Sequence, residues 1–251
     1  MHVAELWRHP VKSLQGESTD EAVVEDPGLA GDRQWGIVDC ETGMVLTARR
    51  VPSLLLASAR LTETGVELLL PDGDVLMAPS AHTDDVLSNW IGRRVALVRA
   101  ESTGPGVGEY FEDATDDNSA VVSWTMPQGR FVDALPLLVV TTASLRQGRA
   151  LHPAGAWETR RFRPNIVIDV EDDGWIEDAW CGRTVRVGTA AVRPVVPCER
   201  CTMVTRAQPG LDRDLDVFKS LARHHGATFG VWSTVQTPGV VRVGDEVTLT
   251  D

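Results

Sequence analysis

Short apolar runs, broken at close intervals by turn residues, most constrain how the first half of the chain folds. The turns are marked by E-T-G at 41–43 and P-D-G at 71–73, and apolar runs bounded by such residues are typical of β-strands. The predicted strands are 3–7, 11–14, 21–25, 33–38, 44–47, 54–61, 65–70, 75–78 and 95–99. We expect them to form a barrel or a sandwich, with one short helix at 81–91.

The composition changes to Gly, Ser, Asp and Glu between residues 101 and 129. An acidic run at 112–117 carries most of the local charge, and we interpret it as a solvated loop. Cation binding is the alternative, but the spacing does not match an EF-hand loop. Residues 101–130 are therefore predicted to connect two domains.

The second half begins near Phe131 and again predicts strands, now with more helix. Its predicted strands are 135–141, 165–170, 183–187, 191–196, 231–235 and 246–250, and its predicted helices are 142–151 and 214–225. Thr142 or Ser144 is the expected cap of the first of these helices. The predicted fold is mainly β (α+β), with domains at 1–100 and 131–251.

Charge and cysteine content narrow the function. A net charge of −12 and a pI near 4.9 disfavour nucleic-acid and membrane-surface binding, because both partners attract basic proteins. The first residues lack the layout of a signal peptide, and no apolar segment approaches the roughly 20 residues that span a bilayer. Four cysteines do not form a disulfide framework in a chain of this size, so we expect a cytoplasmic protein.

The sequence P-C-E-R-C at 197–201 is the main candidate for chemistry. Cys198 and Cys201 flank Arg200, and a guanidinium favours the thiolate that acts as nucleophile or soft metal ligand. Buried cysteines that only fill space are the plain alternative. The two cysteines could also be half of a zinc site, but the chain has no second C-x-x-C to complete it. A thiol–disulfide redox protein is a further alternative, but the sequence lacks the βαβ context of such proteins.

Basic and hydrogen-bonding residues gather in four further stretches, at 10–14, 31–33, 47–50 and 160–165. Each stretch alone is typical of a surface charge. Together they supply the Arg, Lys, Ser and Asn groups that a phosphorylated heterocycle needs. The chain has no Walker loop, no G-x-G-x-x-G, no H-E-x-x-H and no G-x-S-x-G, which disfavours the nucleotide-binding and hydrolase classes that use them.

Seven motifs, in order along the chain, resemble the MOSC proteins, named for the C-terminal domain of molybdenum cofactor sulfurase. They are H-P-V-K-S-L at 9–14, G-D-R-Q-W at 31–35, L-T-A-R at 46–49, R-F-R-P-N-I-V-I at 161–168, P-C-E-R-C at 197–201, F-G-V at 229–231 and V-G-D-E-V at 243–247. The likeness is to the two-part members, which have an N-terminal MOSC β-barrel domain before the MOSC β-barrel domain. The layout is most similar to that of the mitochondrial amidoxime-reducing component and its bacterial relatives.

This resemblance implies an enzyme that binds the molybdenum cofactor (Mo-molybdopterin) and reduces N-hydroxylated compounds such as amidoximes and hydroxylamines. It implies Cys201 as the metal ligand, with Cys198 as the alternate. The implied cofactor contacts are Lys12, Ser13, Arg33, Arg163, Asn165, Glu199 and Arg200, with Thr47, Arg49 and Ser144 as weaker candidates.

The chain ends without the cysteines of an iron–sulfur domain found in some relatives, so electrons are expected from a separate protein. A non-catalytic carrier of the cofactor, or of sulfur as a Cys201 persulfide, is the alternative function. The family-level association with pyridoxal phosphate binding is a further implication of the resemblance.

Overall fold

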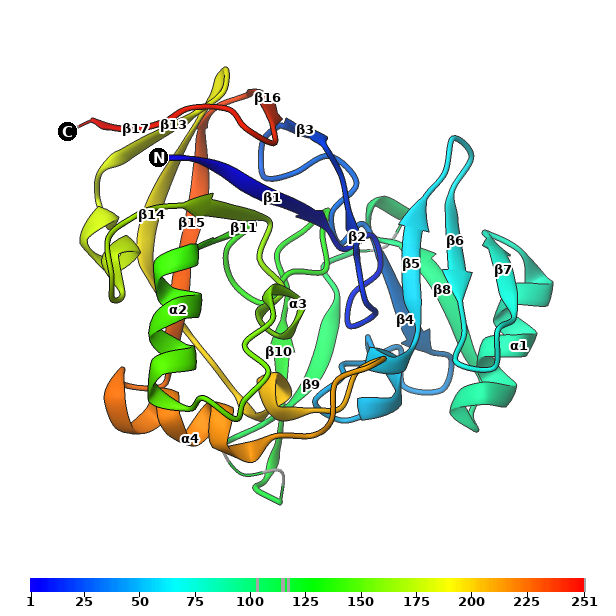
Figure 1. Ribbon diagram of the computed structural model, residues 1–251. Coiled ribbons are helices and arrows are strands. Elements are labelled where there is room, and N and C mark those ends of the chain that lie inside the picture. The colour runs from blue at the N-terminus through cyan, green and yellow to red at the C-terminus, as the bar shows by residue number, and fades with distance from the viewer. Residues whose placement is uncertain (103, 114–115, 117, 251) are drawn as a thin grey trace.

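The computed structural model describes residues 1–102, 104–113, 116 and 118–250. Its strands are β1 (His2–Arg8), β2 (Glu17–Ser18), β3 (Glu21–Val24), β4 (Trp35–Asp39), β5 (Ser58–Leu61), β6 (Val66–Leu69), β7 (Val75–Ala78), β8 (Val95–Arg99), β9 (Val107–Phe111), β10 (Val121–Thr125), β11 (Leu137–Thr141), β12 (Ile166–Asp169), β13 (Thr184–Val187), β14 (Ala190–Glu199), β15 (Thr228–Thr237), β16 (Gly239–Arg242) and β17 (Val247–Thr250). Its α-helices are α1 (Ala81–Ile91), α2 (Thr142–Leu151), α3 (Thr159–Phe162) and α4 (Leu215–His224). The predicted mainly-β class with a few helices is confirmed (Figure 1).

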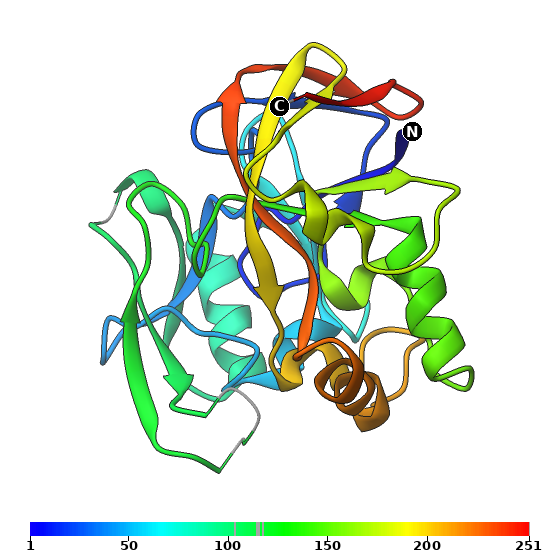
Figure 2. The same ribbon diagram turned by 90° about the vertical axis from the view of Figure 1, so that its left-hand side faces the viewer.

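The largest sheet has eight strands in the order β17-β13-β14-β15-β11-β12-β1-β2. β1, from the start of the chain, pairs antiparallel with β12, and β3 pairs with β16. The parallel pair β11–β12 is connected through α2, which covers one side of the sheet (Figures 1 and 2). The N-terminal segment is therefore fastened to the second half by main-chain hydrogen bonds as well as by side chains.

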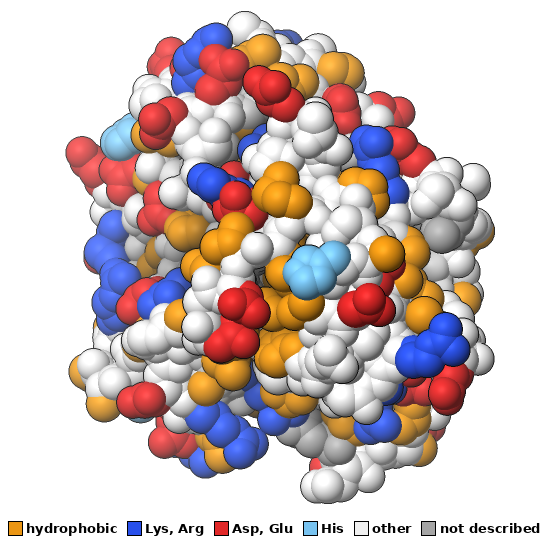
Figure 3. Space-filling model, turned by 90° about the vertical axis from the view of Figure 1, so that its right-hand side faces the viewer, with side chains coloured by type: hydrophobic (Ala, Val, Ile, Leu, Met, Phe, Trp, Pro, Cys, Tyr) orange, Lys and Arg blue, Asp and Glu red, His pale blue; other side chains and the backbone are white. Residues whose placement is uncertain are grey.

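The rest of the first half forms three small sheets, β4–β8, β5–β6–β7 and β9–β10. A separate apolar cluster around Leu54, Leu68 and Leu87 fills the space beneath the sheets β4–β8 and β5–β6–β7. α1 covers this cluster; it begins after Ser80, whose side chain accepts from the Thr83 amide, and ends at Gly92 in the left-handed conformation. On the face shown in Figure 3, basic, acidic and apolar side chains are interspersed.

Several local predictions were wrong. Residues 101–130 are not simply a loop, because β9 and β10 form an antiparallel hairpin there. The hairpin was not predicted because the acidic residues between its two strands dominate the composition of this segment. Within the acidic run at 112–117, Ala114, Thr115 and Asp117 lie outside the described residues. The predicted strand 54–61 is a 3-10 turn, Pro52–Leu56, followed by β5, and 44–47 forms only isolated bridges through Val45.

The second half departs from prediction at two helices. α3 was not predicted, because four residues are too few to show a helical period. The cap of α2 is Thr141 rather than Thr142 or Ser144, and its hydroxyl accepts from the Ser144 amide at 3.2 Å. The division into domains at residues 100 and 130 stays a prediction.

Gly230 lies within β15, at the irregularity where β15 pairs with the end of β14 in P-C-E-R-C. Its φ of +72° is left-handed, and an added Cβ would lie 2.7 Å from the Val139 carbonyl oxygen and 2.7 Å from a Val140 methyl carbon. Both features require glycine. β15 can approach β11 this closely only because residue 230 has no side chain.

We expect Gly230→Ala to lower the free energy of unfolding by about 3 kcal/mol, because backbone strain and overpacking add. Gly73→Ala is the matched control: its φ is also positive, at +97°, but an added Cβ would meet no atom within 4 Å. The control should cost about 1 kcal/mol. Equal costs in urea unfolding would show that the contact with β11 contributes nothing.

Candidate functional site

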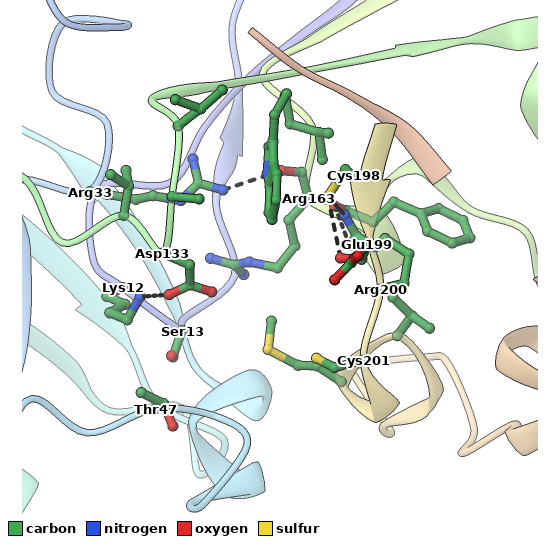
Figure 4. Close-up of a pocket in the computed structure, with 18 of the residues that line it drawn as sticks. Lys12, Ser13, Arg33, Thr47, Asp133, Arg163, Cys198, Glu199, Arg200 and Cys201 are labelled. Atoms are coloured by element: carbon green, nitrogen blue, oxygen red, sulfur yellow. Dashed lines mark hydrogen bonds and ion pairs between the residues drawn. The ribbon is translucent and has the colours of Figure 1, made fainter. Parts of the chain in front are cut away.

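A pocket lies between the two halves of the chain, and most of the predicted site residues line it (Figure 4). The first half contributes loop residues that precede or follow short strands, and the second half contributes the ends of β14 and α3. The predicted residues that line it are Lys12, Ser13, Arg33, Thr47, Arg49, Arg163, Asn165, Cys198, Glu199, Arg200 and Cys201. Their roles in cofactor binding stay predictions, but their convergence on one pocket is observed.

Ser144 is the exception, because it does not line this pocket. Its hydroxyl is buried and donates to the carboxylate of Glu177 at 2.7 Å. Thr141 donates to the same carboxylate at 2.7 Å. Burial raises the pKa of Glu177, and these two hydroxyls partly offset that shift. Ser144 thus belongs to a buried polar cluster beneath α2.

Three pocket residues hold the backbone in an unfavourable conformation. Ser13, Arg33 and Arg163 have φ values of 72°, 50° and 56°, in the left-handed region that non-glycine residues rarely adopt. Strain of this kind costs about 1–3 kcal/mol per residue and gathers at functional sites. The location of these three strained residues around one pocket is an observation of the backbone and supports this pocket as the candidate site.

Asp133 is the centre of the pocket's charge network, although sequence reasoning missed it. Its carboxylate forms an ion pair with Lys12, accepts from Arg49 Nη2 at 3.2 Å, and accepts from Tyr110 Oη at 2.8 Å. Burial would raise the pKa of Asp133, but Lys12 and Arg49 outweigh burial and hold it well below its usual range. A single Asp among 36 acidic residues carries no motif, so only the fold identifies it.

The pairing with Asp133 also raises the pKa of its two basic partners, Lys12 and Arg49, against the effect of burial. Burial lowers the pKa of Lys12, and Asp133 partly restores it. Burial acts in the same direction on Arg49, but Asp133 and Cys201 more than offset it, so the pKa of Arg49 is raised. The Arg49 guanidinium also lies 4.3 Å from the Tyr110 ring centroid, a cation–π contact that holds it over the pocket wall.

Arg163 is a buried cation of the pocket whose pKa is strongly lowered. Burial and the neighbouring Arg33 lower its pKa to about 9. Its Nη1 donates to the Leu14 carbonyl at 2.5 Å rather than to a carboxylate, whereas Arg33 has an ion pair with buried Asp32. Arg33 also donates to the Arg163 carbonyl at 3.2 Å. Arg33 and Arg163 are thus held close together, and the Asp32 carboxylate pairs with Arg33.

The two cysteines have different arginine partners, which corrects the expectation that Arg200 lies beside the ligand thiol. Arg200 Nη1 donates to Cys198 Sγ at 3.0 Å. Arg49 Nε, from the first half of the chain, donates to Cys201 Sγ at 3.3 Å. Cys198 is buried, and burial raises its pKa despite Arg200. Cys201 is half-buried, and its sulfur is therefore the accessible thiol of the pair.

Some predicted contacts are already engaged by the protein. Ser13 Oγ accepts from the Ala48 amide at 2.9 Å, and Thr47 Oγ1 donates to the Glu109 carbonyl at 3.0 Å. The amide side chain of Asn165 accepts from the Leu138 amide at 3.0 Å and is buried. These three side chains fix loops around the pocket, and Asn165 aligns β11 with the start of β12.

The zinc alternative gains no support. In the described ranges of the chain, no three His, Cys, Asp or Glu side chains are grouped so that they could hold a metal ion.

The backbone of Arg200 is supported by the turn after α4. The Arg200 amide donates to the Ala227 carbonyl at 2.8 Å. His225 stabilises this turn: its Nδ1 lies 2.9 Å from the Thr228 carbonyl oxygen, and its Nε2 lies 2.7 Å from Asp178 Oδ2. The His225 ring stacks on Trp175 with centroids 4.3 Å apart. Burial would lower the pKa of His225, but Asp178 and the Thr228 carbonyl outweigh it, so the pKa is raised.

A pH-dependent contribution to stability follows. Because the folded state raises the pKa of His225 above 6.5, the Asp178 pair contributes fully below that pH and is lost as pH rises through the folded-state pKa. We expect Asp178→Asn to destabilise by about 1 kcal/mol at about pH 6 and much less at about pH 9. Asp216→Asn, which removes an exposed ion pair with Lys219, is the control and should change little at either pH.

The pocket contains more positive than negative charge. Five basic side chains, Lys12, Arg33, Arg49, Arg163 and Arg200, face three carboxylates, Asp32, Asp133 and Glu199. Within the part of the chain that the structure describes, Arg200 Nε is buried without a hydrogen-bond partner. An excess of buried and half-buried basic groups favours an anionic ligand, above all a phosphate.

Inorganic phosphate should therefore raise the Tm of the protein, by about 3 °C at tenfold above its Kd. Arg163→Met should remove most of this shift. Arg146→Met is the control, because Arg146 donates to the Val170 carbonyl at 2.9 Å and does not line the pocket. A phosphate-induced shift of equal size in all three proteins would mean that the anion binds elsewhere.

None of the helices that the structure describes is both long and apolar enough to cross a membrane. Residues 1–116 match the MOSC N-terminal beta barrel domain, and residues 127–248 match the MOSC domain. Together these two matches extend over both sides of the pocket.

The chain is similar to proteins with named activities. It is 29% identical to mitochondrial amidoxime reducing component 2 of Homo sapiens over 287 residues, which cover 98% of this chain and 82% of that protein. It is 28% identical to mitochondrial amidoxime-reducing component 1 of Homo sapiens over 294 residues, with the same two coverages. Molybdenum cofactor sulfurase of Drosophila grimshawi is 26% identical over 252 residues, which cover 87% of this chain and 30% of that protein. Taken with the mainly-β fold, these matches show that the chain belongs to the MOSC-domain proteins that carry an N-terminal MOSC β-barrel domain.

Proposed function

We propose that this protein is a molybdenum-cofactor-dependent oxidoreductase that reduces N-hydroxylated compounds such as amidoximes and hydroxylamines. The observation that carries the proposal is the position of Cys201, a half-buried thiol on the edge of a cationic pocket, with Arg49 Nε 3.3 Å from its sulfur. The names of the relatives, amidoxime reducing components and a molybdenum cofactor sulfurase, support the same chemistry.

The residues of the pocket fit the cofactor. A pterin cofactor of this type has an anionic phosphate at one end and a metal held by soft sulfur donors at the other. Arg33, Arg163 and the unpartnered Nε of Arg200 would pair with the phosphate, and Cys201 would supply the protein thiolate. Arg49 would balance the negative charge of that thiolate and at the same time hold Asp133.

The chemistry is a balanced two-electron reduction. When bound, the cofactor supplies oxygen-atom transfer coupled to two electrons. The N–O bond of the amidoxime breaks, two electrons and two protons are consumed, and an amidine and water leave. The electrons come from a separate electron-transfer protein.

The protein's own groups govern protons and polarity in the pocket. Burial and Asp133 raise the pKa of Tyr110, so its hydroxyl stays protonated and donates to Asp133 Oδ1. Lys12 Nζ donates to the Phe131 carbonyl at 3.1 Å and is held by Asp133. Both groups line the pocket, and as hydrogen-bond donors they would favour departure of a substrate oxygen as water.

The test is molybdenum content together with benzamidoxime reduction by an artificial electron donor, in protein made in a host that supplies the cofactor. Cys201→Ala should lose the metal and lower activity by about 100-fold or more. Cys198→Ala should keep the metal and at least about a tenth of the activity, because its sulfur is buried against Arg200. Cys181, which lies outside the pocket, gives the unaffected control variant Cys181→Ala.

Fully loaded protein that does not turn over any N-hydroxylated compound would overturn the reductase assignment. Metal-free protein with a cyanide-releasable sulfur on Cys201 would favour the carrier alternative instead. Equal losses in Cys198→Ala and Cys201→Ala, without any dependence on metal, would point to thiol–disulfide chemistry.

A further inference from the structure

β10 has unusually apolar residues on an exposed strand. All five of its residues, V-V-S-W-T, are exposed, and Val122 and Trp124 remain 40% and 54% accessible. β10 forms a hairpin with β9, and this two-stranded ribbon projects from the body at the left of Figure 2. Exposed Val and Trp in a strand without a covering layer need an explanation.

The strand register shows which face these side chains share. Val122 is opposite Tyr110, and Trp124 is opposite Gly108, so all four residues lie on one face of the ribbon. Tyr110 lines the pocket, and its hydroxyl reaches Asp133. Val121 is opposite Phe111 and therefore lies on the other face. Val122 and Trp124 thus lie on the same face of the ribbon as a residue that lines the pocket.

Trp124 is also fixed in place, despite its exposure. Its indole Nε1 donates to the main-chain oxygen of Asp133 at 2.9 Å. Asp133 is the residue whose carboxylate joins Lys12, Arg49 and Tyr110 at the pocket. The ring is therefore tied to the same residue that organises the charged site, which leaves its apolar surface free in a defined orientation.

Resting on the proposed function, we propose that Val122 and Trp124 form an apolar platform beside the pocket that selects substrates with an aromatic or bulky apolar body. The N-hydroxylated group enters the polar pocket, and the apolar body lies against the indole and Val122. This arrangement matches how small-molecule sites combine apolar contact area with a few directed polar groups.

The size of the platform favours a small molecule over a protein partner. A stable protein interface buries about 800 Å² on each side and involves about 20–30 residues. Val122 and Trp124 offer the area of one aromatic ring, next to the pocket and on the same face as Tyr110. The substrate itself is the occupant that this geometry fits.

The test compares benzamidoxime with acetamidoxime, which share the reacting group and differ in the apolar body. Trp124→Ala should raise the KM for benzamidoxime about tenfold, which corresponds to about 1.4 kcal/mol, and should change that for acetamidoxime less than about threefold. Trp124→Phe should keep most of the preference because it keeps an aromatic ring. Val121→Ala, on the opposite face of the same strand, is the matched control and should behave as wild type.

Trp124→Phe also separates the platform from a structural role, because it loses the hydrogen bond to Asp133 as Trp124→Ala does. If Trp124→Phe and Trp124→Ala weaken both substrates equally, the indole only positions Asp133, and the platform is refuted. An unchanged ratio of the two substrates in Trp124→Ala refutes it as well.

Direct binding keeps this test independent of turnover. Calorimetric titration of the purified, cofactor-loaded protein with each amidoxime should show about tenfold weaker benzamidoxime binding in Trp124→Ala, and little change for acetamidoxime. If that difference is found in protein that does not turn over, the platform stands and the reductase assignment falls. If wild type binds the two amidoximes equally, the platform falls whether or not the enzyme is active.

Discussion

The carboxylate of Asp133 is the interaction on which the rest of the site depends. It contacts Lys12, Arg49 and Tyr110, all from the first half of the chain, while Asp133 itself lies in the second half, four positions before the first residue of β11. Without this carboxylate, two cations would lie in a partly desolvated space beside Arg33 and Arg163, and each would lose its main source of compensation. The same negative charge therefore joins the halves and permits the cationic pocket between them.

The contact between the two halves also determines which arginine lies beside each cysteine. In sequence, C-E-R-C suggests that Arg200 serves both thiols, but its guanidinium contacts Cys198 and the Phe162 carbonyl, at 3.0 and 2.9 Å. Cys201 has Arg49 instead, and Arg49 is itself held by Asp133. The Cys198 thiol is thus buried within the second half, whereas the Cys201 thiol contacts Arg49 from the first half. A MOSC domain alone would contain both cysteines, but only the two-part chain has the arginine that contacts the accessible one.

The sequence predicted the strand-rich fold and most of the pocket lining, for different physical reasons. Period-two runs and turn residues are enough to predict most strands, and helical spacing of apolar residues is enough to predict α1, α2 and α4. Tyr110 and Asp133 could not be found in this way, because each lies in a segment whose acidic or loop-like composition hides its partners. Their roles arise from contacts between residues 23 to 121 positions apart, and spacing along the chain carries no information about such contacts.

Ser144 and Asn165 were predicted as cofactor contacts, but their side chains make hydrogen bonds within the protein. Both have the chemistry of a ligand contact, and both are used by the protein: Ser144 donates to the carboxylate of buried Glu177, and Asn165 aligns two strands. A hydroxyl or amide can satisfy an internal polar group as readily as a ligand, so residue type alone does not separate the two uses.

The surplus of positive charge has a consequence for the protein without its ligand. Burial beside Arg33 lowers the pKa of Arg163 to about 9, which means that the folded state holds its charge at a cost. Three strained backbone positions around the same pocket add to that cost. A bound phosphate would relieve the repulsion among the guanidinium groups, and binding to the folded state alone raises its stability in proportion to the logarithm of ligand concentration. The pocket therefore couples anion binding to the stability of the contact between the two halves, because Asp133 cannot neutralise every cation that this contact brings together.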